Sequence, residues 1–157
     1  MESTPALVTA MVERLLLMEA VAQYKWNKGM PIENQAREHE VLNKVVASAE
    51  AHGLAVDLAW DFFRAQIAAA KAIQSRLFDT WRQGGVSSFP SAPDLKTQSR
   101  PAIGALTGRI IEALAQLNAI DAEALCAALD PVPHPLAEYA EAWFIAVAPL
   151  RERANGC

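Results

Sequence analysis

Apolar residues recur every three or four positions along most of the chain, which is the spacing of one buried face of an α-helix. No stretch alternates apolar and polar residues as a half-buried strand would. The repeats predict helices over about residues 5–27, 34–52, 57–82, 99–118, 121–129 and 135–153. Such helices bury their apolar faces by sharing a core. We therefore expect an all-α fold, a single-domain bundle of about six helices covering residues 1–157.

The expected helix ends carry residues that favour such positions. Residues whose side chains cap a helix N-terminus stand at four predicted starts: Thr4, Asn34, Asp57 and Ser99. Glycines, which commonly end helices, follow three of the helices: Gly29, Gly53 and Gly84. The segment 84–99 is rich in Gly, Ser and Pro and is expected to be a loop.

Composition and charge limit the kinds of partner. The chain has 157 residues, of which 52% are hydrophobic, enough for one domain with a substantial core. Its net charge of −4 offers no basic face to phosphates, so we expect no nucleic-acid binding. Its longest apolar stretches fall well short of the roughly 20 residues that span a bilayer, so we expect no membrane insertion. A small dianion could still bind, because that requires only a local cluster of cations.

Four cations and one amide interrupt faces that should be buried. The apolar stripe of the first predicted helix includes two of these cations: Leu7, Met11, Arg14, Met18, Val21 and Lys25. Gln74 stands on the stripe of the third helix, and Arg37 and Arg100 lead the stripes of the second and fourth. One alternative is that the long side chains extend along the surface and leave their charges in water. Another is that the cations pair with acids of other helices, but no Asp or Glu occupies these stripes.

Taken together, these five side chains suit a small anion with two carboxylates in a pocket of the bundle. Arginine binds a carboxylate through two parallel hydrogen bonds, and lysine contributes a point charge. The periodicity does not identify the ligand.

Several segments resemble the AroQ class of chorismate mutases, particularly its secreted (gamma) subclass. The resemblance rests on Arg14 with Lys25 eleven residues later, and on the segments 31–38, 66–74 and 99–100. It extends over nearly the whole chain. The combined spacing of Arg, Lys, Arg, Gln and Arg is more specific than any single element.

The resemblance implies rearrangement of chorismate to prephenate, a unimolecular [3,3] reaction that requires no cofactor and no metal. It implies that Arg14, Arg37 and Arg100 clamp the two carboxylates, without assigning which arginine meets which carboxylate. It further implies that Lys25 contacts a carboxylate and the ether oxygen, and that Gln74 donates to the same oxygen. Glu38 would accept from the substrate hydroxyl, and Asn34 would contribute a helix cap and a backbone N–H at the binding site.

Three positions depart from the family pattern. Asn34 replaces a frequent Asp, a mild change if this position contributes chiefly a helix cap and a backbone N–H. Gln74 stands where many members carry a Glu that must be protonated to donate, so we expect a flat pH profile without an acidic optimum. Ala70 stands where several members carry Ser or Thr, so one hydroxyl contact is expected to be absent or supplied elsewhere.

The resemblance also implies a homodimer whose active sites each lie within one protomer, with catalytic helices at about 5–118 and C-terminal helices at about 121–153. In the secreted subclass a disulfide links the C-terminal helices, and Cys126 and Cys157 fall where it is expected. These features favour a periplasmic or secreted protein whose leader peptide has been removed, because the N-terminus has no signal-peptide character.

Other interpretations remain open at this point. A noncatalytic helical protein could use the same pocket to bind or sense a metabolite of the aromatic pathway. The three histidines are scattered and predict no metal site. Lys71 adjoins the expected site but is interpreted as a solvated lysine.

Overall fold

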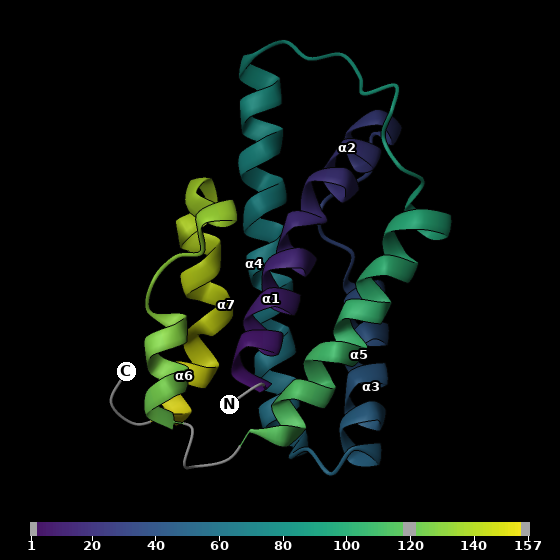
Figure 1. Cartoon of the computed structure of the whole chain (residues 1–157). Coiled ribbons are helices and arrows are strands. Elements are labelled where there is room, and N and C mark those ends of the chain that lie inside the picture. Colours follow the sequence, from purple (N-terminus) through teal and green to yellow (C-terminus); the bar gives the residue numbers. More distant parts are fainter. Residues whose placement is uncertain (1–2, 118–121, 155–157) are drawn as a thin grey trace.

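A computed structural model describes residues 3–117 and 122–154, and within these ranges the chain is helical with no strand. Figure 1 shows α4, the longest helix, running through the middle of the bundle. It packs against α2 and α3, and α7 covers another of its sides. If α1 and α2 are counted as one predicted helix, the described residues contain the six long elements expected, and the prediction of an all-α bundle is confirmed. The elements are α1 (Ser3–Leu16), α2 (Met18–Lys28), α3 (Gln35–Ala51), α4 (Val56–Gln83), the π-helical turn η1 (Leu95–Ser99), α5 (Arg100–Gln116), α6 (Ala122–Leu129), the 3₁₀ segment η3 (His134–Tyr139) and α7 (Ala140–Arg153).

The first predicted helix is divided at Leu17 into α1 and α2. Leu17 keeps right-handed helical angles (φ −67°, ψ −14°). Its N–H donates to the Glu13 carbonyl and its carbonyl accepts from the Val21 N–H, each at 3.2 Å. The face that carries Arg14 and Lys25 therefore continues through the interruption.

The predicted starts of α3 and α4 have different outcomes. Asn34 caps α3 as expected, its side-chain oxygen accepting from the Arg37 N–H at 3.0 Å. Asp57 does not cap α4: it lies inside the first turn, and the capping position belongs to Ala55, which has no capping side chain. At the end of α2, Gly29 adopts the left-handed conformation (φ 64°) that favours glycine, as predicted for a helix stop.

The fourth predicted helix begins earlier than expected, and the assignment of Ser99 as its cap is wrong. Ser99 is buried in helical conformation and its side chain makes no capping hydrogen bond. Asp94 caps the preceding turn η1 instead, where its Oδ2 accepts from the Thr97 N–H at 2.9 Å. The additional turn precedes Arg100 and leads directly into α5.

The C-terminal elements α6, η3 and α7 cover one side of the bundle, where α7 packs against α4 and α6 against α1. The last predicted helix begins as the 3₁₀ segment η3 and becomes α-helical only at Ala140. Trp143 is fully buried, and its indole N–H donates to the Leu129 carbonyl at 3.0 Å. Gln66 of α4 is also fully buried, and its amide nitrogen lies 3.5 Å from the Ala146 carbonyl oxygen. The first contact joins α7 to α6, and the second joins α4 to α7.

Candidate active site

Residues from α1 to α5 surround a cavity of about 140 Å³. All seven residues predicted to act on the substrate line it: Arg14, Lys25, Asn34, Arg37, Glu38, Gln74 and Arg100. The remaining lining residues are Lys71 and the apolar side chains Met18, Val21, Ile32, Val41, Ile67, Ala70, Leu95 and Ile103. These sixteen lining residues come from α1, α2, α3, α4, α5, the α2–α3 loop and η1.

Arg14 is the most deeply buried cation of the cavity, with 4% of its surface exposed. Its Nε lies 3.3 Å from the hydroxyl oxygen of Thr107 on α5, and its guanidinium carbon lies 5.9 Å from the centre of the Phe63 ring. Within the described part of the chain, its Nη1 has no hydrogen-bond partner. Burial lowers the pKa of Arg14 to about 10, which leaves it charged at neutral pH. The cavity therefore contains a buried positive charge with an unused donor.

Gln74 is similarly buried, with 4% of its surface exposed. Its amide nitrogen lies 3.7 Å from the sulfur of Met18, a weak acceptor. Among the described residues, no group donates to its amide oxygen. A buried amide normally has strong partners, so this side chain is available to a ligand.

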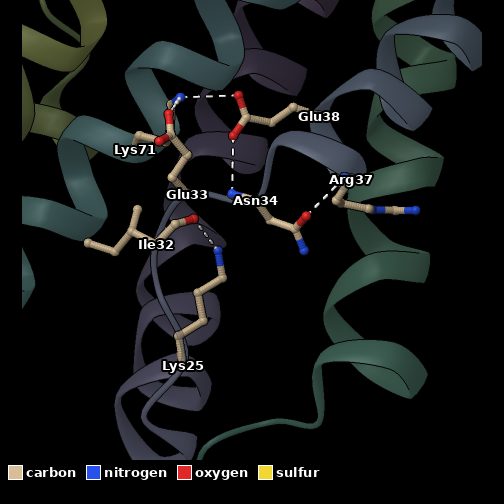
Figure 2. Close-up of polar contacts among 7 residues, drawn as sticks. All are labelled: Lys25, Ile32, Glu33, Asn34, Arg37, Glu38 and Lys71. Atoms are coloured by element: carbon tan, nitrogen blue, oxygen red, sulfur yellow. Dashed lines mark hydrogen bonds and ion pairs between the residues drawn. The ribbon is translucent and has the colours of Figure 1, made fainter.

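Lys25 points from α2 towards the α2–α3 loop, where its Nζ donates to the Ile32 carbonyl at 2.8 Å (Figure 2). Burial lowers the pKa of Lys25, and the positive charges of Arg100 and Lys71 lower it further. The negative charge of Glu38 opposes these effects. Crowding among cations is expected in a pocket that binds an anion.

Lys71 is not the solvated lysine that the sequence suggested. Its Nζ lies 3.1 Å from a carboxylate oxygen of Glu33 and 3.1 Å from one of Glu38, as Figure 2 shows. Burial lowers the pKa of Lys71, but hydrogen bonds and charges of the two carboxylates outweigh this effect and the net shift is upward. Steps of four and three residues connect Ile67, Lys71 and Gln74, so the helical period could have placed Lys71 on the cavity face.

Arg37 has an acid partner, contrary to the expectation that the stripe cations lack one. Its Nη1 lies 3.1 Å from Glu40 Oε1, one turn along α3, and its side chain is 31% exposed. In Figure 2 its guanidinium extends away from Lys25 and Glu38. Glu40 stands outside the apolar stripe, so the stripe does not predict this contact.

The cavity adjoins a second hollow, of about 330 Å³, between α3 and α5. Arg14, Arg37 and Arg100 line both hollows. Gly104 on α5 also lines the second, and a Cβ atom at this position would meet no atom within 4 Å. The arginine cluster is thus reached from the space between these two helices.

Comparison with known proteins points to one family. The family model described as chorismate mutase type II matches residues 5–75. A secreted chorismate mutase of Mycolicibacterium smegmatis is 30% identical over 148 residues, which cover 85% of this chain and 81% of that protein. This chain belongs to the chorismate mutase type II family. The resemblance found from Arg14, Lys25, Arg37, Gln74 and Arg100 is therefore confirmed at the level of the family.

Other relatives and solved structures agree with this membership. A secreted chorismate mutase of Mycobacterium tuberculosis is 35% identical over 105 residues, covering 67% of this chain and about half (52%) of that protein. The crystal structure of chorismate mutase from Burkholderia thailandensis superimposes with a TM-score of 0.82 at 32% identity, covering 96% of this chain and 99% of that one. For secreted chorismate mutase from Yersinia pestis the TM-score is 0.70 at 26% identity, with 95% and 94% covered.

Two further features bear on the site and its surroundings. Within residues 3–117 and 122–154, no three His, Cys, Asp or Glu side chains gather where they could hold a metal ion. None of the described helices is both long and apolar enough to span a bilayer.

Proposed function

We propose that this chain is a chorismate mutase that converts chorismate to prephenate in the cavity between α1 and α5. The observation that carries the proposal is the convergence of three arginines, one lysine and one amide from five helices on one cavity. Two of them, Arg14 and Gln74, are buried with unused hydrogen-bonding capacity. A dicarboxylate whose ether oxygen links the enolpyruvyl arm to the ring offers acceptors for all of these donors.

The arginines would hold the substrate in its reactive shape. Chorismate carries two carboxylates, and its enolpyruvyl arm must fold over the ring before the carbon–oxygen bond breaks and the new carbon–carbon bond forms. Fixing both carboxylates to Arg14, Arg37 and Arg100 reduces the conformations that the arm explores, which can account for a large share of the rate increase. The rearrangement is unimolecular and requires no nucleophile from the protein.

Lys25 and Gln74 would stabilise the transition state. As the carbon–oxygen bond breaks, negative charge grows on the ether oxygen. A cation and an amide donor placed at that oxygen interact more strongly with the transition state than with the substrate, and such differential interaction accelerates the reaction. The Lys25 ammonium gives one of its three N–H groups to the Ile32 carbonyl and has others for the ether oxygen, and Gln74 has only a weak acceptor to give up.

Glu38 and Asn34 would complete the binding of the ring. The two oxygens of Glu38 accept from Lys71 and from the backbone N–H of Asn34, and each can accept a second hydrogen bond, here from the substrate hydroxyl. Arg37 would exchange its exposed contact with Glu40 for a substrate carboxylate. An exposed ion pair contributes about 0.2–1 kcal/mol, so this exchange costs little.

The test is to add purified protein to chorismate in the presence of a metal chelator and to follow the loss of chorismate absorbance. Prephenate should form in equal amount. Lys25→Ala and Arg37→Ala should each lower kcat/KM by orders of magnitude with unchanged circular dichroism, whereas Lys96→Ala, an exposed lysine outside the cavity, should behave as the parent. Normal activity in both cavity variants would refute the assigned site, and binding without turnover by the parent would favour the noncatalytic alternative.

We further infer that the protein is exported, forms a homodimer and carries a disulfide between Cys126 and Cys157. The support for export is that relatives from Mycobacterium tuberculosis, Mycolicibacterium smegmatis and Yersinia pestis are named secreted chorismate mutases. Cys126 lies on α6, while Cys157 lies outside the described residues. Mass spectrometry of the non-reduced protein tests the disulfide, and analytical ultracentrifugation tests the dimer.

A further inference from the structure

The loop between α2 and α3 borders the cavity and is fixed to it by polar contacts on either side (Figure 2). The Ile32 carbonyl accepts from Lys25 at 2.8 Å, and the Glu33 carboxylate contacts Lys71 at 3.1 Å. The Asn34 N–H donates to Glu38 at 3.3 Å. Three consecutive residues of this loop thus take part in the network.

Lys71 connects two of these contacts through one ammonium group. It lies within 3.1 Å of both Glu33 and Glu38, which stand on opposite sides of Asn34 in the sequence. It also stands on α4, one turn before Gln74. Lys71 therefore joins the loop that contacts Lys25 to the helix that presents Gln74.

The contacts of Lys71 affect how the two groups that would bind the ether oxygen, Lys25 and Gln74, are placed relative to each other. Lys25 and Gln74 come from different helices, α2 and α4, and must both reach one atom of the substrate. The Lys25 ammonium is held by the carbonyl of Ile32, the neighbour of Glu33. Releasing Glu33 and Glu38 from α4 would loosen this loop and shift the Lys25 ammonium relative to the Gln74 amide.

The positive charge of Lys71 also favours binding of an anionic substrate. Without Lys71, the carboxylates of Glu33 and Glu38 would stand at the edge of a cavity built for a dianion. One ammonium contacts both carboxylates and offsets their repulsion of the substrate. The stability of the fold depends little on these contacts, because the three side chains are 31%, 61% and 24% exposed and such pairs contribute little to stability.

We propose that Lys71 is a positioning residue, which fixes Glu38 and the 32–34 segment to α4 and thereby holds the Lys25 ammonium in register with the Gln74 amide. This inference rests on the proposed mutase activity. The substrate is the same dicarboxylate, and Lys71 acts on its rearrangement through Glu33 and Glu38 and not by contacting the substrate itself.

The test measures kcat and KM for Lys71→Met, Lys71→Arg, Glu33→Gln and the double variant Lys71→Met/Glu33→Gln. Lys71→Met should lower kcat roughly tenfold with a smaller change in KM, because a misplacement of about 1 Å can cost about 10²-fold and the displacement expected here is smaller. Lys71→Arg should restore most of kcat, since a guanidinium can bind both carboxylates. Glu33→Gln should have a smaller effect, and the double variant should be no slower than Lys71→Met.

Lys96→Met is the matched control, since it removes the same charge from an exposed residue outside the cavity, and it should leave both constants unchanged. A rise in KM alone for Lys71→Met would show direct substrate binding and overturn the inference. Unchanged kinetics in Lys71→Met, no rescue by arginine, or additive losses in the double variant would also overturn it. Should Lys71→Met fail to fold, a Glu33→Gln variant with the parent's kcat overturns the inference. Failure of the mutase activity itself is visible separately, as a parent protein that leaves chorismate unchanged.

Discussion

The amide nitrogen of Gln74 on α4 lies 3.7 Å from the thioether sulfur of Met18 on α2. Sulfur is among the weakest acceptors in proteins, so this contact hardly competes with an oxygen that carries developing negative charge. The same amide is buried where α4 packs against α2. The site thus contains a neutral donor that is in place before the substrate binds.

The pH dependence should reflect this neutral donor. An amide donates regardless of pH, so kcat should be flat between pH 5 and 8, and Gln74→Glu should create an acidic optimum because a carboxyl donates only when protonated. On the alkaline side, the lowered pKa of Lys25 should make activity fall at lower pH than for an ordinary lysine. Rate profiles of the two proteins check this. A steep fall of the parent's rate between pH 5 and 8 would contradict the role of Gln74.

Replacing Arg14 by an apolar residue should raise the stability of the fold and lower the activity. Its guanidinium is 4% exposed and has an unpartnered nitrogen, so Arg14→Met removes a desolvated charge and should raise the free energy of unfolding by about 1–3 kcal/mol. The same change should lower kcat/KM roughly 10²- to 10³-fold, because a buried carboxylate of the substrate loses its partner. Urea unfolding and steady-state kinetics give the two quantities. Arg109→Met, at an exposed position on α5, should change neither by much, and a destabilised Arg14→Met would contradict this account of the burial.

The Asn34 cap should contribute to the stability of α3. Asn34→Ala removes the acceptor for the Arg37 N–H and should lower the free energy of unfolding by about 1 kcal/mol. Asn34→Asp keeps an acceptor at the same place and should be as stable as the parent. Thermal unfolding compares the three proteins. Equal stability of the alanine variant would show that the cap contributes nothing to α3.

Glu40 should restrain Arg37 in the free protein. Glu40→Gln removes the carboxylate that lies 3.1 Å from Arg37 Nη1, so the guanidinium no longer has to leave an ion pair to bind the substrate. KM should fall by about 1.5- to fivefold with unchanged kcat, as expected for an exposed ion pair of 0.2–1 kcal/mol. Glu50→Gln removes the same charge from another exposed position of α3 and is the control. A higher KM for Glu40→Gln would mean that the pair positions Arg37 for the substrate.

The helical period predicted the fold and the four cations and one amide that line the cavity, whereas Glu38 and Asn34 followed only from the family resemblance. Arg14, Lys25 and Gln74 interrupt apolar stripes, and such interruptions mark polar groups that face the interior. The break at Leu17 and the start at Asp94 were not predicted, because a one-residue interruption and a π-helical turn leave almost no trace in the period.

Side-chain pairing was harder to predict than side-chain placement. The contact of Lys71 with Glu33 joins residues 38 positions apart, across a loop whose path the period does not describe. The Arg37 contact with Glu40 depends on the rotamer of a long, partly exposed side chain, which the sequence does not specify.

The structure of the protein bound to a rigid bicyclic dicarboxylate, one that mimics the folded transition state, tests the central claim most directly. We predict that the ligand occupies the cavity between α1 and α5, with its carboxylates on the arginines. Its ether oxygen should lie about 2.7–3.2 Å from both Lys25 Nζ and Gln74 Nε2. A ligand bound outside this cavity, or one whose ether oxygen contacts neither side chain, would contradict the account.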